Sequence, residues 1–186
     1  MASGASLRGM VYASMFGALT AVGALLSIPL YPVPITLQTL FTFLAGLLLG
    51  GYFGALSQVV YVLLGIIGVP VFGGGKAGLG VLLGPTGGYL FGFIVGAYVI
   101  GSLVQARKDP GLAWLLLAVI LGDLVIYAAG ITQLAFVARL GLRKALLVGL
   151  APFVIGDAAK CLFAVLLARK IRKQPFWPRT LSYRND

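Results

Sequence analysis

The sequence predicts an all-α integral membrane protein, folded as a single domain of six transmembrane helices over residues 1–186. Two observations predict it. Hydrophobic residues make up 60% of the chain and charged residues only 10%, whereas soluble domains are near 25% charged. Six apolar stretches follow one another, separated by prolines, glycines and basic residues. Six spans of ~20 residues would fill roughly 120 positions, which leaves short loops and no separate soluble domain.

The first predicted span lies in the apolar run at 10–30, which follows a single basic residue, Arg8. A cleavable signal peptide is the alternative, but this run is long enough to cross a bilayer and further spans follow it. Pro29, Pro32 and Pro34 mark the turn after it. The second and third spans have only ~15 residues each and are expected to be tilted or short of the full thickness. The later spans are predicted at 36–49, 52–67, 88–104, 112–131 and 146–168.

Basic residues predict the orientation. Fourteen Lys and Arg stand against four acidic residues, a net charge of +10. They flank apolar stretches, which points to lipid and membrane topology, not to nucleic acid. With the N-terminus inside, the cytoplasmic side receives Arg8, Arg107, Lys108, Arg169, Lys170, Arg172, Lys173, Arg179 and Arg184, and the outer side Lys76, Arg139, Arg143 and Lys144. We therefore expect both termini in the cytoplasm of a bacterial-type plasma membrane, with the basic tail, 170–186, at its inner surface or against a partner subunit.

The sequence carries no catalytic machinery. It has no histidine, no Gly-x-Ser-x-Gly motif and no ATP-binding motif, and its one cysteine, Cys161, lies in an apolar span. We therefore expect neither an enzyme nor a metal site nor a cofactor. If the protein moves a solute uphill, the energy must come from a partner or from an ion gradient.

The most unusual loop is the stretch at 69–89, VPVFGGGKAGLGVLLGPTGGY. Lys76 lies in its middle, Thr86 is a candidate helix cap, and Tyr89 closes it. Glycines let backbone N–H groups face a ligand, and a helix N-terminus favours an anion. Ala77 stands where a nucleotide-binding loop has Ser or Thr, so no nucleotide site is expected; a flexible connector is the alternative. The eight glycines are Gly73, Gly74, Gly75, Gly78, Gly80, Gly84, Gly87 and Gly88.

The second constellation is Asp157 and Lys160, three residues apart on the last span and therefore on one helix face. Each charged side chain costs ~2.5–3.5 kcal/mol at the centre of a membrane helix. A polar cavity would explain why both are kept: the aspartate would accept from ligand N–H groups and the lysine would donate to a carbonyl or carboxylate. The alternative is a self-neutralising structural pair.

Weaker signals lie elsewhere. Asp123 has Tyr127 four residues on as a plausible hydrogen-bond neighbour, and a structural tie is as well supported as a ligand role. Gln38 and Thr39, at the start of the second span, could face the outer mouth. Tyr61 and Tyr98 are expected in the core or an interfacial belt.

Small residues recur every four positions on the first span, at Ala13, Gly17 and Ala21. Such a stripe serves either packing within the bundle, which spacing alone favours, or docking of a partner subunit.

The chain resembles the BioY family, the biotin-binding S components of energy-coupling factor transporters. The resemblance covers nearly the whole chain and rests on PVPITLQTL at 32–40, LLGPTGGYLFGF at 82–93 and GDAAK at 156–160. It implies a six-helix bundle that holds biotin near the outer side. It also implies that Asp157 and Lys160 contact the vitamin, and that the loop carrying Thr86 and Gly87 lies beside it.

The resemblance further implies partners: a transmembrane coupling protein, met through the stripe of Ala13, Gly17 and Ala21, and the ATP-binding cassette ATPases of the complex. The predicted function is capture of extracellular biotin and its delivery to the cytoplasm. Lys76, the loop amides and the helix after them could hold the carboxylate of biotin. The alternative is a stand-alone secondary vitamin transporter driven by protons through Asp123 and Asp157.

Overall fold

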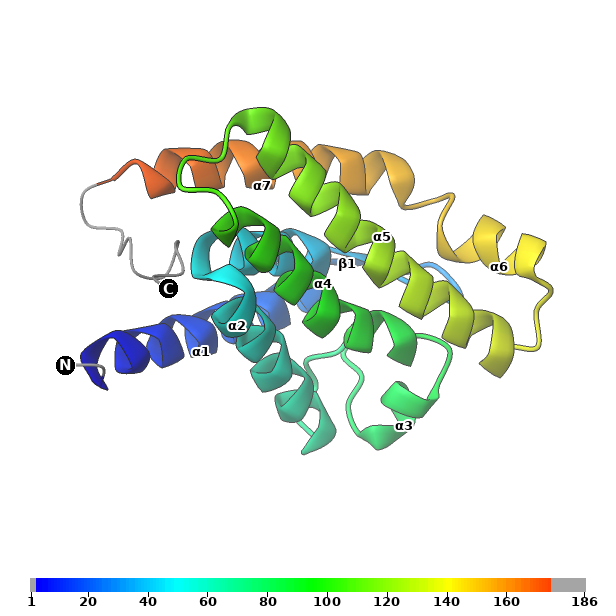
Figure 1. The fold of residues 1–186 in the computed structure, drawn as a ribbon. Coiled ribbons are helices and arrows are strands. Elements are labelled where there is room, and N and C mark those ends of the chain that lie inside the picture. Colours follow the sequence, from blue (N-terminus) through cyan, green and yellow to red (C-terminus); the bar gives the residue numbers. More distant parts are fainter. Residues whose placement is uncertain (1–2, 175–186) are drawn as a thin grey trace.

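The structure is a computed structural model that describes residues 3–174, so part of the predicted basic tail, 175–186, lies outside the described residues. The chain is helical almost throughout (Figure 1), as predicted. The elements in chain order are α1 (Ser3–Leu25), β1 (Ser27–Ile28), β2 (Ile35–Thr36), α2 (Gln38–Ile66), α3 (Leu79–Leu83), α4 (Gly87–Gln105), α5 (Leu112–Val137), α6 (Leu142–Gly149) and α7 (Val154–Arg172).

Within the described residues, α2, α4 and α5 are each long and apolar enough to cross a membrane. A fourth candidate is the pair α6 and α7, which meet at a bend of 52°. The predicted last span, 146–168, is thus wrong at its start, because residues 150–153 separate the two helices. Pro152 lies in that break, where its missing N–H cannot continue a helix.

The first predicted span also ends too late. Helix α1 stops at Leu25, and the chain then forms a short antiparallel hairpin in which Ser27 pairs with Thr36 and Ile28 with Ile35. Three prolines between these strands exclude a helix there. The hairpin places Thr36 directly before α2, where it becomes part of the candidate site.

Helix α2 contains a break at Gly50, whose φ of 79° and ψ of −178° are not helical. The break falls between the second and third predicted spans, so each occupies one arm of α2. Two neighbouring helices supply hydrogen bonds at the break: Gln105 of α4 accepts from the N–H of Gly51 at 3.0 Å, and Arg172 of α7 donates to the carbonyl of Leu47 at 2.9 Å. This satisfies backbone groups that would otherwise be unpaired in an apolar bundle.

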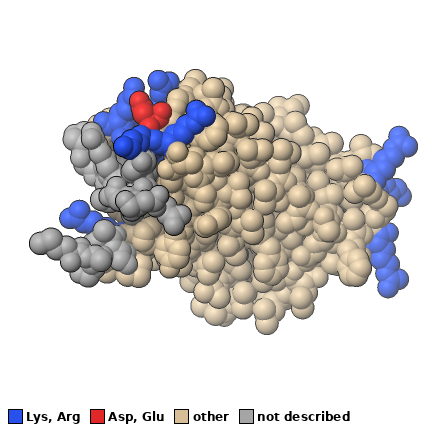
Figure 2. Space-filling view, viewed as in Figure 1, with Lys and Arg blue, Asp and Glu red and all other residues tan. Residues whose placement is uncertain are grey.

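Helix α4 lies between α2 and α5, and α1 packs on α2. The centre of the bundle is formed by fully buried side chains such as Phe43, Leu47, Tyr61 and Ile100. Large apolar side chains are exposed on the outside, as expected of helices that face lipid. In the space-filling view the Lys and Arg side chains gather at two opposite ends of the molecule (Figure 2).

The stripe of small residues on α1 faces inward. Ala13 is fully buried, Ala21 and Gly17 are buried as well, and a Cβ added to Gly17 would lie 2.9 Å from the carbonyl oxygen of Ser57 on α2. The stripe therefore packs α1 against this chain's own α2, and the predicted docking face for a partner is wrong at these three residues. Spacing alone could not tell which side of α1 turns inward.

Candidate functional site

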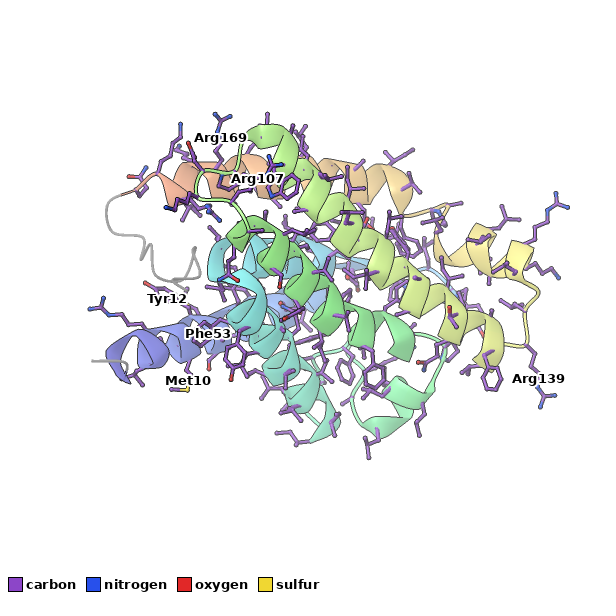
Figure 3. The ribbon with its side chains drawn as sticks, viewed as in Figure 1. Met10, Tyr12, Phe53, Arg107, Arg139 and Arg169 are labelled. Atoms are coloured by element: carbon purple, nitrogen blue, oxygen red, sulfur yellow. The ribbon has the colours of Figure 1, made fainter. Side chains whose placement is uncertain are left out.

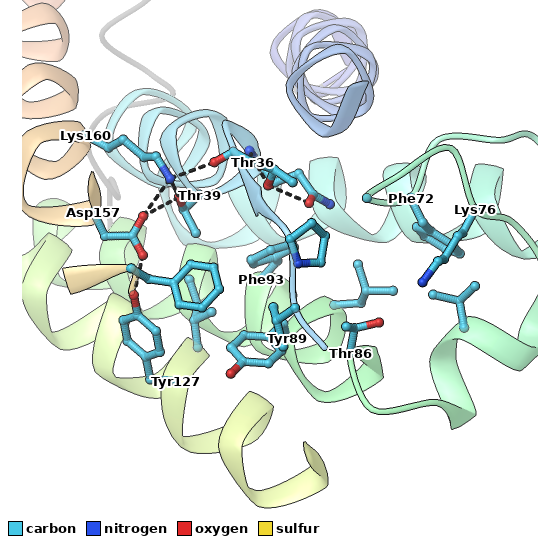
Figure 4. A pocket seen from close by; sticks show the side chains of 18 residues that line it. Thr36, Thr39, Phe72, Lys76, Thr86, Tyr89, Phe93, Tyr127, Asp157 and Lys160 are labelled. Atoms are coloured by element: carbon cyan, nitrogen blue, oxygen red, sulfur yellow. Dashed lines mark hydrogen bonds and ion pairs between the residues drawn. The ribbon is translucent and has the colours of Figure 1, made fainter. Parts of the chain in front are cut away.

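A pocket of about 680 Å³, including its open mouth, lies between α2, α4, α5 and α7. Of the residues predicted from the sequence, the pocket brings together Gln38, Lys76, Thr86, Tyr89, Asp157 and Lys160. Figure 4 shows the Asp157–Lys160 pair at one end of this pocket and Lys76 at the other.

The pair end is a dense hydrogen-bonding cluster (Figure 4). The Nζ of Lys160 lies 2.7 Å from Oδ1 of Asp157 and also donates to the carbonyl oxygen of Thr36 at 2.6 Å and to Oγ1 of Thr39 at 3.1 Å. Thr39 in turn donates to Oδ1 of Asp157 at 3.0 Å, and the hydroxyl of Tyr127 donates to Oδ2. Asp157 is only 4% exposed, so its carboxylate is buried among these partners.

The hydrogen bonds of the pair are therefore nearly complete within the chain. All three ammonium hydrogens of Lys160 have an acceptor, and Asp157 accepts three bonds, one fewer than the four that its two oxygens can take. Most hydrogen bonds of the two side chains are thus made within the chain, as the alternative of a self-neutralising structural pair predicts. One acceptor position on Oδ2 of Asp157 remains for an N–H group of a ligand.

At the loop end of the pocket, unlike at the pair end, hydrogen-bond donors are left for a ligand. A tight hairpin, in which Phe72 pairs with Lys76, carries the Lys76 ammonium to the pocket. Thr86 immediately precedes α4 but its side chain makes no capping bond, so the predicted cap is wrong. Within residues 3–174, the ammonium of Lys76 and the hydroxyl of Thr86 have no hydrogen-bond partner, so both can donate to a ligand.

Apolar and aromatic side chains form the walls between the two ends. Tyr89 and Tyr127 meet edge to face with ring centroids 6.5 Å apart, and the hydroxyl of Tyr89 donates to the carbonyl oxygen of Gly149 at 2.8 Å. These contacts hold both rings in place, and both tyrosines line the pocket. The other apolar lining residues are Val33, Pro34, Phe72, Val81, Leu90, Phe93, Ile126 and Phe153.

The side chain of Gln38 is buried, and both the oxygen and the nitrogen of its amide group are hydrogen-bonded. Its Oε1 accepts from the hydroxyl of Thr36 at 2.7 Å, and its Nε2 donates to the hydroxyl of Tyr61. Tyr61 itself is fully buried behind the pocket, as the core alternative predicts, whereas Tyr98 is 53% exposed, as an interfacial residue would be. A polar network thus continues from the pocket into the second arm of α2.

Two predicted residues are placed elsewhere. Gly87 does not line the pocket: a Cβ there would lie 1.8 Å from the carbonyl oxygen of Leu82, so this glycine allows α3 to pack on the start of α4. Asp123 is also absent from the lining, and within the described residues its buried Oδ1 has no hydrogen-bond partner. The predicted link from Tyr127 to Asp123 is wrong, because the hydroxyl of Tyr127 donates to Asp157.

Sequence reasoning missed several lining residues. Thr39 was predicted only to face the outer mouth, yet Thr36 and Thr39 both contact Lys160 from a segment more than 120 positions away in the chain, and spacing along the chain does not indicate that approach. Tyr127 could have been found, since it lies in the same polar stretch as Asp123. Phe72, Phe93 and Phe153 are ordinary apolar residues in an apolar chain, and nothing in their spacing marks them.

The chain is similar to known proteins over nearly its whole length. Residues 1–175 match the BioY family. The chain is 48% identical over 167 residues to the biotin transporter BioY of Thermotoga maritima, which covers 90% of this chain and 97% of the relative. It is 41% identical to the biotin transporter BioY of Rhizobium etli, over 89% of this chain and 94% of the relative. A crystal structure of the S-component for biotin from an ECF-type ABC transporter superimposes with a TM-score of 0.89 at 30% identity, over 99% of this chain and 100% of that chain.

Proposed function

The chain belongs to the BioY family, and from this premise we propose that it is a biotin-binding membrane subunit that captures extracellular biotin and delivers it to the cytoplasm. The family is one of transporters and not of enzymes. The observation that carries the proposal is the pocket, which has a polar group at each end and aromatic walls between. Biotin has the same layout, with a cyclic urea at one end and a carboxylate at the other.

The hydrogen bonds already made inside the chain support one orientation of biotin. At the pair end, the remaining acceptor position on Oδ2 of Asp157 suits an N–H of the urea, and Lys160 has no hydrogen left for a ligand acceptor. At the loop end, the Lys76 ammonium can only donate and the Thr86 hydroxyl can donate as well, which suits the carboxylate as an acceptor. In this proposal Lys160 holds Asp157 in place and does not donate to the urea oxygen.

This orientation makes a prediction for Lys76. Replacing Lys76 with glutamine is expected to weaken biotin binding about tenfold, because a charge-assisted hydrogen bond is lost. Binding of biotinamide, which has no carboxylate, should change by less than about twofold. Calorimetric titration of both ligands into the purified protein measures this, with the exposed Lys144→Gln on α6 as the matched control. Equal losses for the two ligands, or no loss for either, would contradict the orientation.

We further propose six membrane crossings, made by α1, the two arms of α2, α4, α5, and the bent pair α6 and α7. The positions of the charges support it: Arg107 and Arg169, predicted inside, lie at one end of the molecule, and Arg139, predicted outside, lies at the other (Figure 3). The first turns of α1 lie at the same end as Arg107 (Figures 1 and 3). Helices α3 and α6 lie toward the opposite end (Figure 1), and the pocket beside them would face outward.

Energy is expected to come from partner subunits, a transmembrane coupling protein and ATP-binding cassette ATPases, because the sequence has no ATP-binding motif. The crystal structure that superimposes on this chain is described as part of an ECF-type ABC transporter, which supports the same proposal. Proton-driven transport through Asp157 is disfavoured, since Lys160 already neutralises that carboxylate at 2.7 Å.

Uptake of labelled biotin into cells that express this chain distinguishes the two sources of energy. We expect uptake to require co-expressed ATPase and coupling subunits and to continue when a protonophore is added while ATP is held constant. Uptake by the chain alone that the protonophore abolishes would contradict energy-coupling partners and favour the proton-driven alternative. The control variant Asp109→Asn, at an exposed aspartate, should behave as the wild type in both conditions.

A further inference from the structure

Gln38, the first residue of α2, has an amide group whose orientation is fixed by Tyr61 of the same helix. The hydroxyl of Tyr61 donates its one hydrogen to the carbonyl oxygen of Val71 at 3.0 Å, because a carbonyl can only accept. The oxygen of Tyr61 is therefore left to accept, and the Nε2 of Gln38 donates to it. The amide nitrogen of Gln38 thus faces Tyr61, and its oxygen faces Thr36.

Thr36 is held in turn by Gln38. The Oε1 of Gln38 accepts from the hydroxyl of Thr36 at 2.7 Å, and the backbone N–H of Gln38 donates to Oγ1 of Thr36 at 3.3 Å. Thr36 ends a hairpin with only two residues in each strand, and a two-stranded hairpin is marginally stable by itself. Both residues are buried. The side-chain bonds of Gln38 therefore contribute to holding Thr36 in its place before α2.

The backbone carbonyl of Thr36 connects this arrangement to the charged pair. It accepts from the Nζ of Lys160 at 2.6 Å, the shortest of the three hydrogen bonds of that ammonium. The other two go to Thr39 and Asp157, and Figure 4 shows the ammonium joined to all three residues. A displaced Thr36 would leave Lys160 with a free hydrogen, which could then be donated to a ligand instead.

We propose that Gln38 is a positioning residue: oriented by Tyr61, it holds Thr36 so that the Thr36 carbonyl keeps Lys160 on Asp157. The pair end of the pocket then offers a ligand an acceptor alone, and the pocket selects ligands that present an N–H group there. This inference rests on the proposed function for the identity of the ligand, whereas the hydrogen bonds themselves need no ligand. The substrate-binding role predicted for Gln38 is in this proposal indirect.

Gln58 provides a matched control on the same helix. It is fully buried, its Oε1 accepts from Thr42 at 3.1 Å, and its Nε2 donates to Thr20 at 3.2 Å and to Ser57 at 3.0 Å. Among the described residues, neither Gln58 nor these three partners line the pocket. Gln58→Met therefore removes at least as many buried hydrogen bonds as Gln38→Met, but none that leads to Lys160.

Calorimetric titration of biotin and biotinamide into the full chain in detergent tests the inference. Gln38→Met should weaken binding of both ligands about tenfold, because both carry the urea. Gln58→Met should lower the melting temperature but change neither affinity by more than about twofold. The inference is overturned if Gln38→Met binds both ligands as the wild type does, or if Gln58→Met loses as much affinity. A loss confined to biotin would also overturn it, since it would place the effect at Lys76.

Thermal melting without ligand tests the connection to Lys160 separately. Gln38→Met is introduced into the wild type and into the double variant Asp157→Asn with Lys160→Met, which has no ammonium for Thr36 to hold. The fall in melting temperature should be at least about twofold smaller in the double variant, and equal falls would overturn the inference. This result does not depend on biotin, so failure of the proposed function is recognised separately. If Gln38→Met does not fold, Tyr61→Phe replaces it in both experiments and should weaken biotinamide binding about threefold.

Discussion

Replacing Asp157 with asparagine is expected to weaken biotin binding by more than tenfold. The variant removes the charge that Lys160, Thr39 and Tyr127 all contact, and it leaves Lys160, whose side chain is only 11% exposed, without its counter-charge. Breaking a buried ion pair from one side costs about 3–5 kcal/mol, and a ligand that bonds to the same carboxylate loses its partner too. Calorimetric titration measures the loss of biotin affinity, and thermal melting measures the loss of stability.

Controls separate a binding role from a structural one. Asp109→Asn, at an exposed aspartate between α4 and α5, should change neither affinity nor melting temperature. The double variant Asp157→Asn with Lys160→Met removes both charges and should regain most of the stability while affinity stays low. If Asp157→Asn binds biotin as the wild type does, or if the double variant recovers full affinity, the pair is structural only and the proposed contact with the urea is wrong.

Replacing Gly101 with alanine is expected to destabilise the fold strongly. A Cβ at Gly101 would lie 2.1 Å from the backbone carbonyl carbon of Gly50 and 2.2 Å from the backbone nitrogen of Gly51. Because backbone atoms cannot turn aside as a side chain can, α4 must move away from the break in α2. Overpacking of this kind costs about 1–3 kcal/mol or more, and a loss of 3 kcal/mol lowers the melting temperature by about 6–12 °C in a chain of this size.

The matched control for this prediction is Gly156→Ala on α7, where a Cβ would meet nothing within 4 Å. It should leave the melting temperature unchanged or raise it slightly, since alanine favours a helix over glycine by up to about 1 kcal/mol. Thermal melting of both variants in the same detergent is the measurement. Equal melting temperatures for Gly101→Ala and the wild type would show that α4 does not approach the break in α2 this closely.

The helical, membrane-spanning character of the chain could be predicted because it depends on composition and on the length of apolar runs. The break at Gly50 fell between two predicted spans for the same reason, since glycines interrupt the apolar run there. The short hairpin before α2 and the five-residue α3 were missed, because elements of so few residues leave no periodic pattern. The stripe that includes Ala13 was predicted to dock a partner, but it faces α2. A stripe of small residues has the same spacing in both cases, so the sequence could not decide between them.

The candidate site was predictable only in part. Asp157 and Lys160 could be placed on one face because three residues make nearly one helical turn, and the resemblance pointed to the loop that carries Lys76 and Thr86. That the pair is almost saturated by Thr36, Thr39 and Tyr127 could not be predicted, because these contacts join segments distant in sequence. This saturation changes the expected chemistry: Asp157 keeps one acceptor position, and the free donors lie at the opposite end of the pocket.

The central claim, that this pocket binds biotin, is tested most directly by calorimetric titration of vitamins into the purified, detergent-solubilised chain. We predict saturable binding of biotin at a single site, and no measurable heat of binding for thiamine or riboflavin. Binding of either of those vitamins, with no detectable binding of biotin, would contradict the claim.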